Sequence, residues 1–98
     1  MNRILLIGHL SAAPVYFCTA EGRDLTRFQL HVDPTEERPA LIHHCQAWGP
    51  AALDLHEHLT EGERVLVRGE LRYRERSLEG IGTVQVPYVY VRGYSYLG

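Results

Sequence analysis

The chain has 98 residues, of which 45% are hydrophobic and 22% are charged, and its formal net charge at pH 7 is −2. This length predicts one domain, residues 1–98, with a single modest core, and the charge argues against wrapping nucleic acid by bulk positive charge alone. No apolar run approaches the ~20 residues that span a bilayer, and no long apolar region or cleavage site marks a secretion signal. We therefore expect a soluble cytoplasmic protein that has no membrane partner.

Three strands are predicted in the first half of the chain. Residues 2–10 form a short run rich in Ile and Leu, residues 26–32 alternate apolar and polar side chains, and residues 40–48 form a third extended segment. The stretch between the first two strands, residues 11–24, contains Pro and Gly and is interpreted as a connection that includes a bent extended piece. Residues 33–39 have two prolines among charges, which is typical of a loop.

One helix and two further strands are predicted in the second half. Residues 49–62 have apolar side chains at a helical period, with Pro50 suited to the first turn and Gly62 to the C-terminal stop. Residues 64–76 and 83–97 follow as long strands joined by a turn. This order predicts an all-β fold: a five-stranded antiparallel barrel of the oligonucleotide-binding (OB) type, with one α-helix between strands 3 and 4.

The segment IHHCQAWG, residues 42–49, contains two histidines, a cysteine and the only tryptophan of the chain. In a strand, His43 and His44 point to opposite sides and cannot chelate one ion. No other residues complete a set of three or four converging ligands, so we expect no metal and no cofactor. Cys45 shares a face with His43, but it is expected inside the barrel, and no convergent set of acid, base and nucleophile is visible. An enzyme is therefore not expected.

The other face of the same segment is suited to nucleic acid. Trp48, His44 and Gln46 share this face. A half-exposed indole can stack on any base, because every base offers a π-face. The alternative is that Trp48 packs against the helix or against a partner subunit.

A row of arginines is predicted on the strand of residues 64–76. Arg72, Arg74 and Arg76 recur at every second position, so their side chains would project from one side about 6–7 Å apart, close to the phosphate spacing of an extended nucleic-acid strand. The alternative is a solvated face, and the interspersed glutamates predict modest affinity that falls steeply with salt. Further cations that could contact phosphates are Arg68, Arg27 and Arg3.

Four stretches of the chain resemble the bacterial single-stranded DNA-binding protein (SSB) family. They are residues 2–15, 20–30, 43–49 and 59–74, and the last, with its Val-x-Val-x-Gly-x-Leu-x-x-Arg pattern, is the most specific. The resemblance implies an OB fold, self-association, and sequence-independent binding of single-stranded DNA in replication, recombination or repair. It also implies that Trp48 occupies the position of a stacking aromatic of the family.

A homo-oligomer is expected, because residues 2–10 are more apolar than an exposed edge strand should be. In the family that the chain resembles, this strand pairs with its counterpart in a second subunit, and we expect a tetramer in preference to a dimer. The predicted interface residues are Asn2, Ile4, Leu6 and His43. For the tyrosines at positions 88, 90, 94 and 96, a role in an interface or in packing is favoured over base stacking.

The sequence departs from the family pattern in two ways. Ile42 and Arg76 stand where stacking aromatics are expected, which leaves Trp48 as the clear one. The chain stops at Gly98 without a flexible acidic tail, so recruitment of replication and repair enzymes through a tail is not expected. An alternative therefore stays open: a tail-less interaction module of the primosomal replication protein N type, which docks proteins or forms mixed oligomers.

Overall fold

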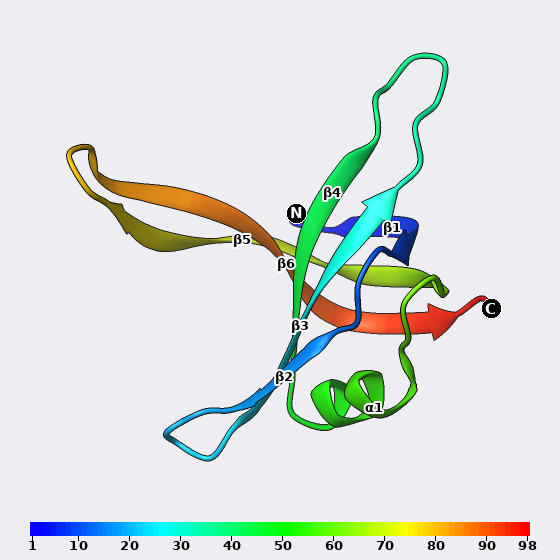
Figure 1. Ribbon diagram of the computed structural model, residues 1–98, viewed down its shortest axis with the longest axis horizontal. Helices are drawn as coiled ribbons and strands as arrows, with labels where there is room; N and C mark the ends of the chain where they lie inside the picture. The colour runs from blue at the N-terminus through cyan, green and yellow to red at the C-terminus, as the bar shows by residue number, and fades with distance from the viewer.

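The computed structural model describes residues 1–98 as six strands and one helix. The elements in chain order are β1 (Ile4–Leu10), β2 (Val15–Cys18), β3 (Asp24–Val32), β4 (Leu41–Trp48), α1 (Pro50–His58), β5 (Arg64–Leu78) and β6 (Gly82–Tyr96). The strands follow the order β1-β5-β6-β4-β3-β2, and β1 also pairs with β3, which closes the sheet into a ring. Figure 1 shows this ring with α1 at one end.

One pair in the ring is parallel, whereas the sequence predicted an antiparallel barrel throughout. Cys45 and Gln46 of β4 lie beside Val89 and Tyr90 of β6 in parallel register, and the other pairs are antiparallel. The reason is geometric. A ring of five neighbours, β1-β3-β4-β6-β5, has an odd number of members, so strand direction cannot alternate at every step.

β1 and β2 are two parts of one bent strand. β1 pairs with β3 only through His9 and Leu10, while β2 pairs with the earlier part of β3, residues 24–27. The bend between them, residues 11–14, ends at Pro14, which has no backbone N–H to give to a ladder. The predicted connection with a bent extended piece is therefore confirmed, and its extended piece is β2.

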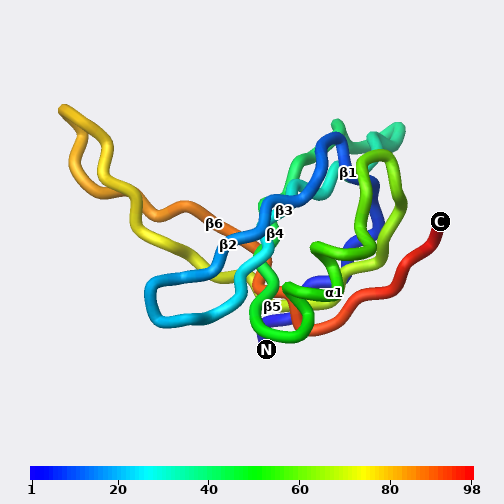
Figure 2. Tube along the Cα trace, turned by 60° about the horizontal axis from the view of Figure 1, so that its bottom comes forward, coloured from blue at the N-terminus to red at the C-terminus, as the bar shows by residue number.

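Three hairpins project from the ring as arms, formed by β2–β3, β3–β4 and β5–β6 (Figure 1). The β5–β6 arm extends clear of the body on the side away from the C-terminus (Figure 2). Each strand of this arm has 15 residues, which is longer than the ring needs. The outer half of the arm therefore presents both of its faces beyond the core.

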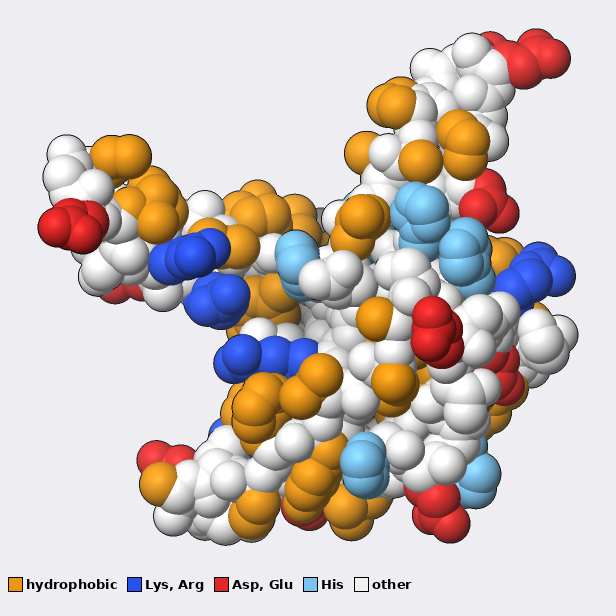
Figure 3. All heavy atoms as spheres, in the orientation of Figure 1, with side chains coloured by type: hydrophobic (Ala, Val, Ile, Leu, Met, Phe, Trp, Pro, Cys, Tyr) orange, Lys and Arg blue, Asp and Glu red, His pale blue; other side chains and the backbone are white.

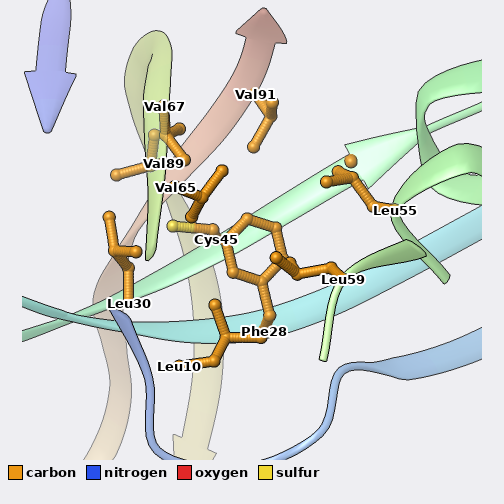
Figure 4. Packing of buried hydrophobic residues seen from close by; sticks show 11 residues of the cluster. Leu10, Phe28, Leu30, Cys45, Leu55, Leu59, Val65, Val67, Val89 and Val91 are labelled. Atoms are coloured by element: carbon orange, nitrogen blue, oxygen red, sulfur yellow. The ribbon is translucent and has the colours of Figure 1, made fainter. Parts of the chain in front are cut away.

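The core is a cluster of buried apolar side chains from every part of the ring and from α1 (Figure 4). The alternation predicted for β3 is confirmed, since Phe28 and Leu30 are buried and face inward. Cys45 is buried among them, and burial raises the pKa of its thiol to about 12. The thiol is therefore neutral near pH 7 and is not an activated nucleophile.

A bulge lies between β5 and β6. Arg68 pairs with Gly93, but the next residue, Gly69, pairs with Val91, which leaves Arg92 as the extra residue on β6. A Cβ at Gly69 would lie 2.2 Å from the backbone oxygen of Tyr90. Glycine is therefore required for the close approach of the two strands at this point.

Replacing Gly69 by alanine is expected to lower the free energy of unfolding by about 1–3 kcal/mol, because backbone atoms must shift to admit the methyl group. Gly93→Ala is the matched control. The three atoms nearest to a Cβ there all belong to the guanidinium of Arg68, a flexible side chain that can move aside. Urea denaturation of both variants measures the difference, and equal destabilisation would contradict the assignment.

The bulge places the four tyrosines of β6 on two different faces. Tyr94 and Tyr96 pair with the buried Val67 and Val65, whereas Tyr88 and Tyr90 pair with Arg72 and Glu70 on the outer face of the arm. Their shared even numbering does not put them on one face, because the extra residue Arg92 inverts the alternation between Tyr90 and Tyr94.

Tyr94 and Tyr96 connect β6 to α1 through hydrogen bonds to Asp54. The hydroxyls of Tyr94 and Tyr96 donate to Asp54 Oδ2 at 2.6 and 2.9 Å, and His58 Nδ1 lies 3.0 Å from Asp54 Oδ1. The hydrogen bond from Tyr94, followed by that from Tyr96, holds the pKa of Asp54 below its usual range. The pKa of His58 is raised, chiefly by its hydrogen bond to the backbone carbonyl of Asp54.

This cluster is expected to make stability depend on pH in both directions. The lowered pKa of Asp54 gives a contribution that is present above the ordinary value of 3.8 and is lost as pH falls. The raised pKa of His58 gives a contribution that is present below the ordinary value of 6.5 and is lost as pH rises. Thermal unfolding of the unmodified protein and of Asp54→Ala should therefore differ most between these two pH values. A difference that stays constant from pH 3 to 8 would refute this role.

Candidate nucleic-acid interface

A groove of about 370 Å³ runs between the β5–β6 arm and the outer face of β3 and β4. We call it the arm groove. Its lining residues include Val15, Arg27, Gln29, His44, Gln46, Arg74, Arg76, Val86 and Tyr88. Figure 3 shows a hollow beside the projecting arm, with Arg side chains and hydrophobic side chains gathered along it. The arm groove thus combines cations, amides and apolar surface in one concave site.

The strand register explains why these side chains meet. Arg27 lies opposite Gln46 and Gln29 lies opposite His44 in the β3–β4 ladder, so all four share the outer face. Arg74 and Arg76 lie opposite Val86 and Val84 on the arm. Of the nine residues predicted to contact nucleic acid, the arm groove brings together Arg27, His44, Gln46, Arg74 and Arg76.

Trp48 lies at the end of β4, half-buried on the outer face and not in the core. It pairs with Leu25, which in turn pairs with Phe17 of β2, so the two aromatic rings flank a buried leucine. The guanidinium of Arg23 lies 4.3 Å from the centre of the Trp48 ring. This cation–π contact covers part of the indole in the free protein.

Phe17 is a candidate that sequence reasoning missed. It is 43% exposed, it shares the outer face with Arg27, and the guanidinium of Arg27 lies 5.3 Å from its ring centre. The missed signal was the segment VYFC, where Val15 and Phe17 alternate with Tyr16 and Cys18. If this segment is extended, Val15 and Phe17 share one face and Tyr16 and Cys18 share the other.

Arg72 has a different environment from Arg74 and Arg76. Its Nε and Nη2 donate to Glu70 Oε2 at 3.2 and 2.9 Å, and its guanidinium lies 3.7 Å from the centre of the Tyr90 ring. The hydrogen bond from Arg72 is the main cause that holds the pKa of Glu70 below its usual range. Of the three arginines in the predicted row, Arg72 therefore has an internal anionic partner, Glu70.

Two other predicted cations lie outside the arm groove. Arg68 is exposed, and its guanidinium lies over Gly93 beside the bulge. Arg3 is exposed near the N-terminus. Neither lines the groove, so a nucleic-acid strand confined to it would not reach them.

The residues predicted for an oligomer interface are partly engaged within the chain. Asn2 extends the β1–β5 ladder with its side chain, which donates to the Leu71 carbonyl at 2.7 Å and accepts from the Leu71 N–H at 2.8 Å. Ile4 and Leu6 pack against the core, and His43 is half-buried opposite Leu30.

The outward apolar side chains of β1 are instead Leu5 and Ile7, which are 64% and 48% exposed. One edge of β1 pairs with β5 from Ile4 to His9, but the opposite edge meets β3 only at His9 and Leu10. Residues 4–8 therefore keep a free backbone edge beside two exposed apolar side chains.

The closed five-membered ring with a helix between β4 and β5 is the arrangement of an OB-fold protein. The model of the single-strand binding protein family matches residues 1–93. The chain belongs to this family. It is similar to the single-stranded DNA-binding protein of Mycobacterium leprae (strain TN), with 31% identity over 80 residues that cover 72% of this chain and 48% of that protein. The chain thus spans about half the length of this curated relative.

No group of three or more His, Cys, Asp or Glu side chains is placed to hold a metal ion. The helix lacks the length and the apolar composition that a membrane crossing requires.

Proposed function

We propose that this protein binds single-stranded DNA without sequence preference through the arm groove and the adjoining aromatic side chains. The observation that carries the proposal is the convergence of Arg27, Arg74 and Arg76, from two separate hairpins, on one groove beside Trp48 and Phe17. Membership of the single-strand binding protein family and the name of the mycobacterial relative support it.

The chemistry of the groove suits a single strand better than a duplex. Aromatic rings can stack only on bases whose faces are free, and such contacts tolerate any base. The arginines of the groove would neutralise phosphates, with Gln46 and His44 offering hydrogen bonds between the two kinds of contact. Because the formal net charge of the chain is −2, attraction depends on this local arrangement, and affinity should fall steeply with salt.

A fluorescence titration tests the proposal, because Trp48 is the only tryptophan in the chain. Oligo-dT is expected to quench its emission with micromolar or tighter affinity, more weakly at the higher of two salt concentrations. A duplex of the same length should have little effect. Absence of any response to oligo-dT, or an equal response to the duplex, would count against the proposal.

We further propose that the protein is a cytoplasmic homo-oligomer, a tetramer in preference to a dimer, acting in replication, recombination or repair. The free edge of β1 and the exposed Leu5 and Ile7 support self-association. Light scattering measures the mass directly. A strictly monomeric mass at micromolar concentration would remove this part of the proposal.

A docking protein is the second candidate. Leu41 and Ile42 at the base of the β3–β4 arm are 47% and 55% exposed, and exposed apolar patches commonly mark protein interaction sites. A pull-down from nuclease-treated extract that yields a stoichiometric protein partner, together with no shift of an oligonucleotide, would favour this candidate over DNA binding.

A further inference from the structure

Beyond the arm groove, a compact charged cluster covers the ring of Tyr90. Arg72 binds one carboxylate oxygen of Glu70, and Arg92 Nη2 donates to the other, Oε1, at 3.3 Å. The same two guanidiniums lie 3.7 and 4.8 Å from the centre of the Tyr90 ring. One carboxylate therefore holds two cations on one aromatic side chain.

The geometry of the β5–β6 ladder produces this arrangement. Glu70 and Tyr90 are directly opposite each other. Arg72 lies on the side of this pair that is nearer the tip of the arm. Arg92, the extra residue of the bulge, lies on the side that is nearer the C-terminus. The two guanidiniums therefore approach the Glu70–Tyr90 pair from its two sides along the strands.

The cluster adjoins the arm groove. Tyr90 lies beside Gln46 in the parallel β4–β6 pair, and Gln46 lines the groove. Arg72 lies opposite Tyr88, which also lines it. A single-stranded nucleic acid that leaves the groove past Gln46 would meet Tyr90 next.

We propose that Tyr90 is a further base-stacking position, which is covered by Arg72 and Arg92 while Glu70 binds both. This inference rests on the proposed function. A phosphate offers guanidinium groups the same kind of bidentate oxygen partner as a carboxylate. A bound strand would therefore take Arg72 and Arg92 from Glu70 with its phosphates, and its base would take their place on the ring.

Glu70 is then a specificity-determining residue that lowers the affinity of the protein for nucleic acid. Each nucleic-acid strand must compete with the Glu70 carboxylate for Arg72 and Arg92. A ligand without a closely spaced base and phosphate cannot replace both the carboxylate at the arginines and the arginines on the Tyr90 ring. Weak anions and isolated bases should therefore leave Arg72 and Arg92 bound to Glu70 over the Tyr90 ring.

Glu70→Gln tests the inference, because it removes the negative charge and keeps the shape of the side chain. Oligo-dT is expected to bind this variant roughly 3- to 20-fold more tightly at low salt. The slope of log affinity against log salt should stay close to that of the unmodified protein, because the same arginines contact phosphates in both complexes. Fluorescence anisotropy of a labelled oligonucleotide measures both quantities.

Glu75→Gln is the matched control. Glu75 is exposed on the same strand, it pairs with Gln85 on the opposite face of the arm, and its replacement makes the same change in net charge. Equal gains in the two variants would show a general charge effect and overturn the inference. So would a Glu70→Gln variant that binds no more tightly than the unmodified protein.

Tyr90→Leu in the Glu70→Gln background separates stacking from charge. The gain in affinity should largely disappear if the base stacks on Tyr90, and its persistence would overturn the stacking position. If the unmodified protein binds oligo-dT and Glu70→Gln binds it no more tightly, this inference is refuted and the proposed function is not. Failure of both proteins to bind would refute the proposed function together with it.

Discussion

Trp48→Ala is expected to weaken binding of oligo-dT by about 1–3 kcal/mol, which is the range measured for removal of one stacked base. The indole lies on the outer face of β4, two residues beyond the groove-lining Gln46, and the Arg23 guanidinium lies 4.3 Å from the centre of its ring. Because the variant has no tryptophan, the measurement uses the anisotropy of a labelled oligonucleotide.

A second aromatic variant, Phe17→Ala, and a control variant, Tyr73→Ala, extend this test. Phe17→Ala should cause a loss of the same order, and the double variant about 2–6 kcal/mol if the two rings stack separate bases. Tyr73 is 56% exposed, but it has the opposite parity to Arg72 and Arg74 on β5 and so faces away from the groove. Tyr73→Ala should therefore bind normally. If Trp48→Ala binds as well as the unmodified protein, the assigned face is wrong.

The double variant Arg74→Ala and Arg76→Ala should bind oligo-dT on the order of 10- to 50-fold more weakly at low salt, because two phosphate contacts are lost. The slope of log affinity against log salt should become shallower by about 1.4, since single strands release roughly 0.7 counterions per contact. Titrations at several salt concentrations measure the slope directly.

A charge-matched control distinguishes contact from general attraction. Arg38 and Arg64 are exposed, and neither lines the arm groove. Replacing both by alanine changes the net charge by the same amount and should leave the salt slope nearly unchanged. Equal losses in the two double variants would mean that the groove arginines act only through the overall field.

Much of the candidate site follows from alternation within single strands. The parity of the segment from Ile42 to Trp48 predicts a buried Cys45 and an outward Trp48, and the structure has both. The parity of Arg74 and Arg76 likewise predicts their common face. These predictions succeed because side-chain direction in a strand is a local property that repeats every two residues.

Other features depended on which strands become neighbours. The sequence alone does not show that Arg92 is an extra residue opposite Arg68 and Gly69, and this residue decides that Tyr90 faces outward while Tyr94 binds Asp54. Nor does it show that Glu70 pairs with Arg72 and Arg92 at the same time. Such pairings join residues far apart in the chain, so they are set by long-range register and not by local pattern.

The amino-acid sequence by itself thus determined the order of strands and helix, the inward faces of β3 and β4, and the face of the only tryptophan. The tertiary structure decided the parallel β4–β6 pair, the arm groove and the closed cluster on Tyr90. The physical reason is that a strand's own alternation selects its buried face. A concave site requires faces from several strands, and these meet only when the ring closes.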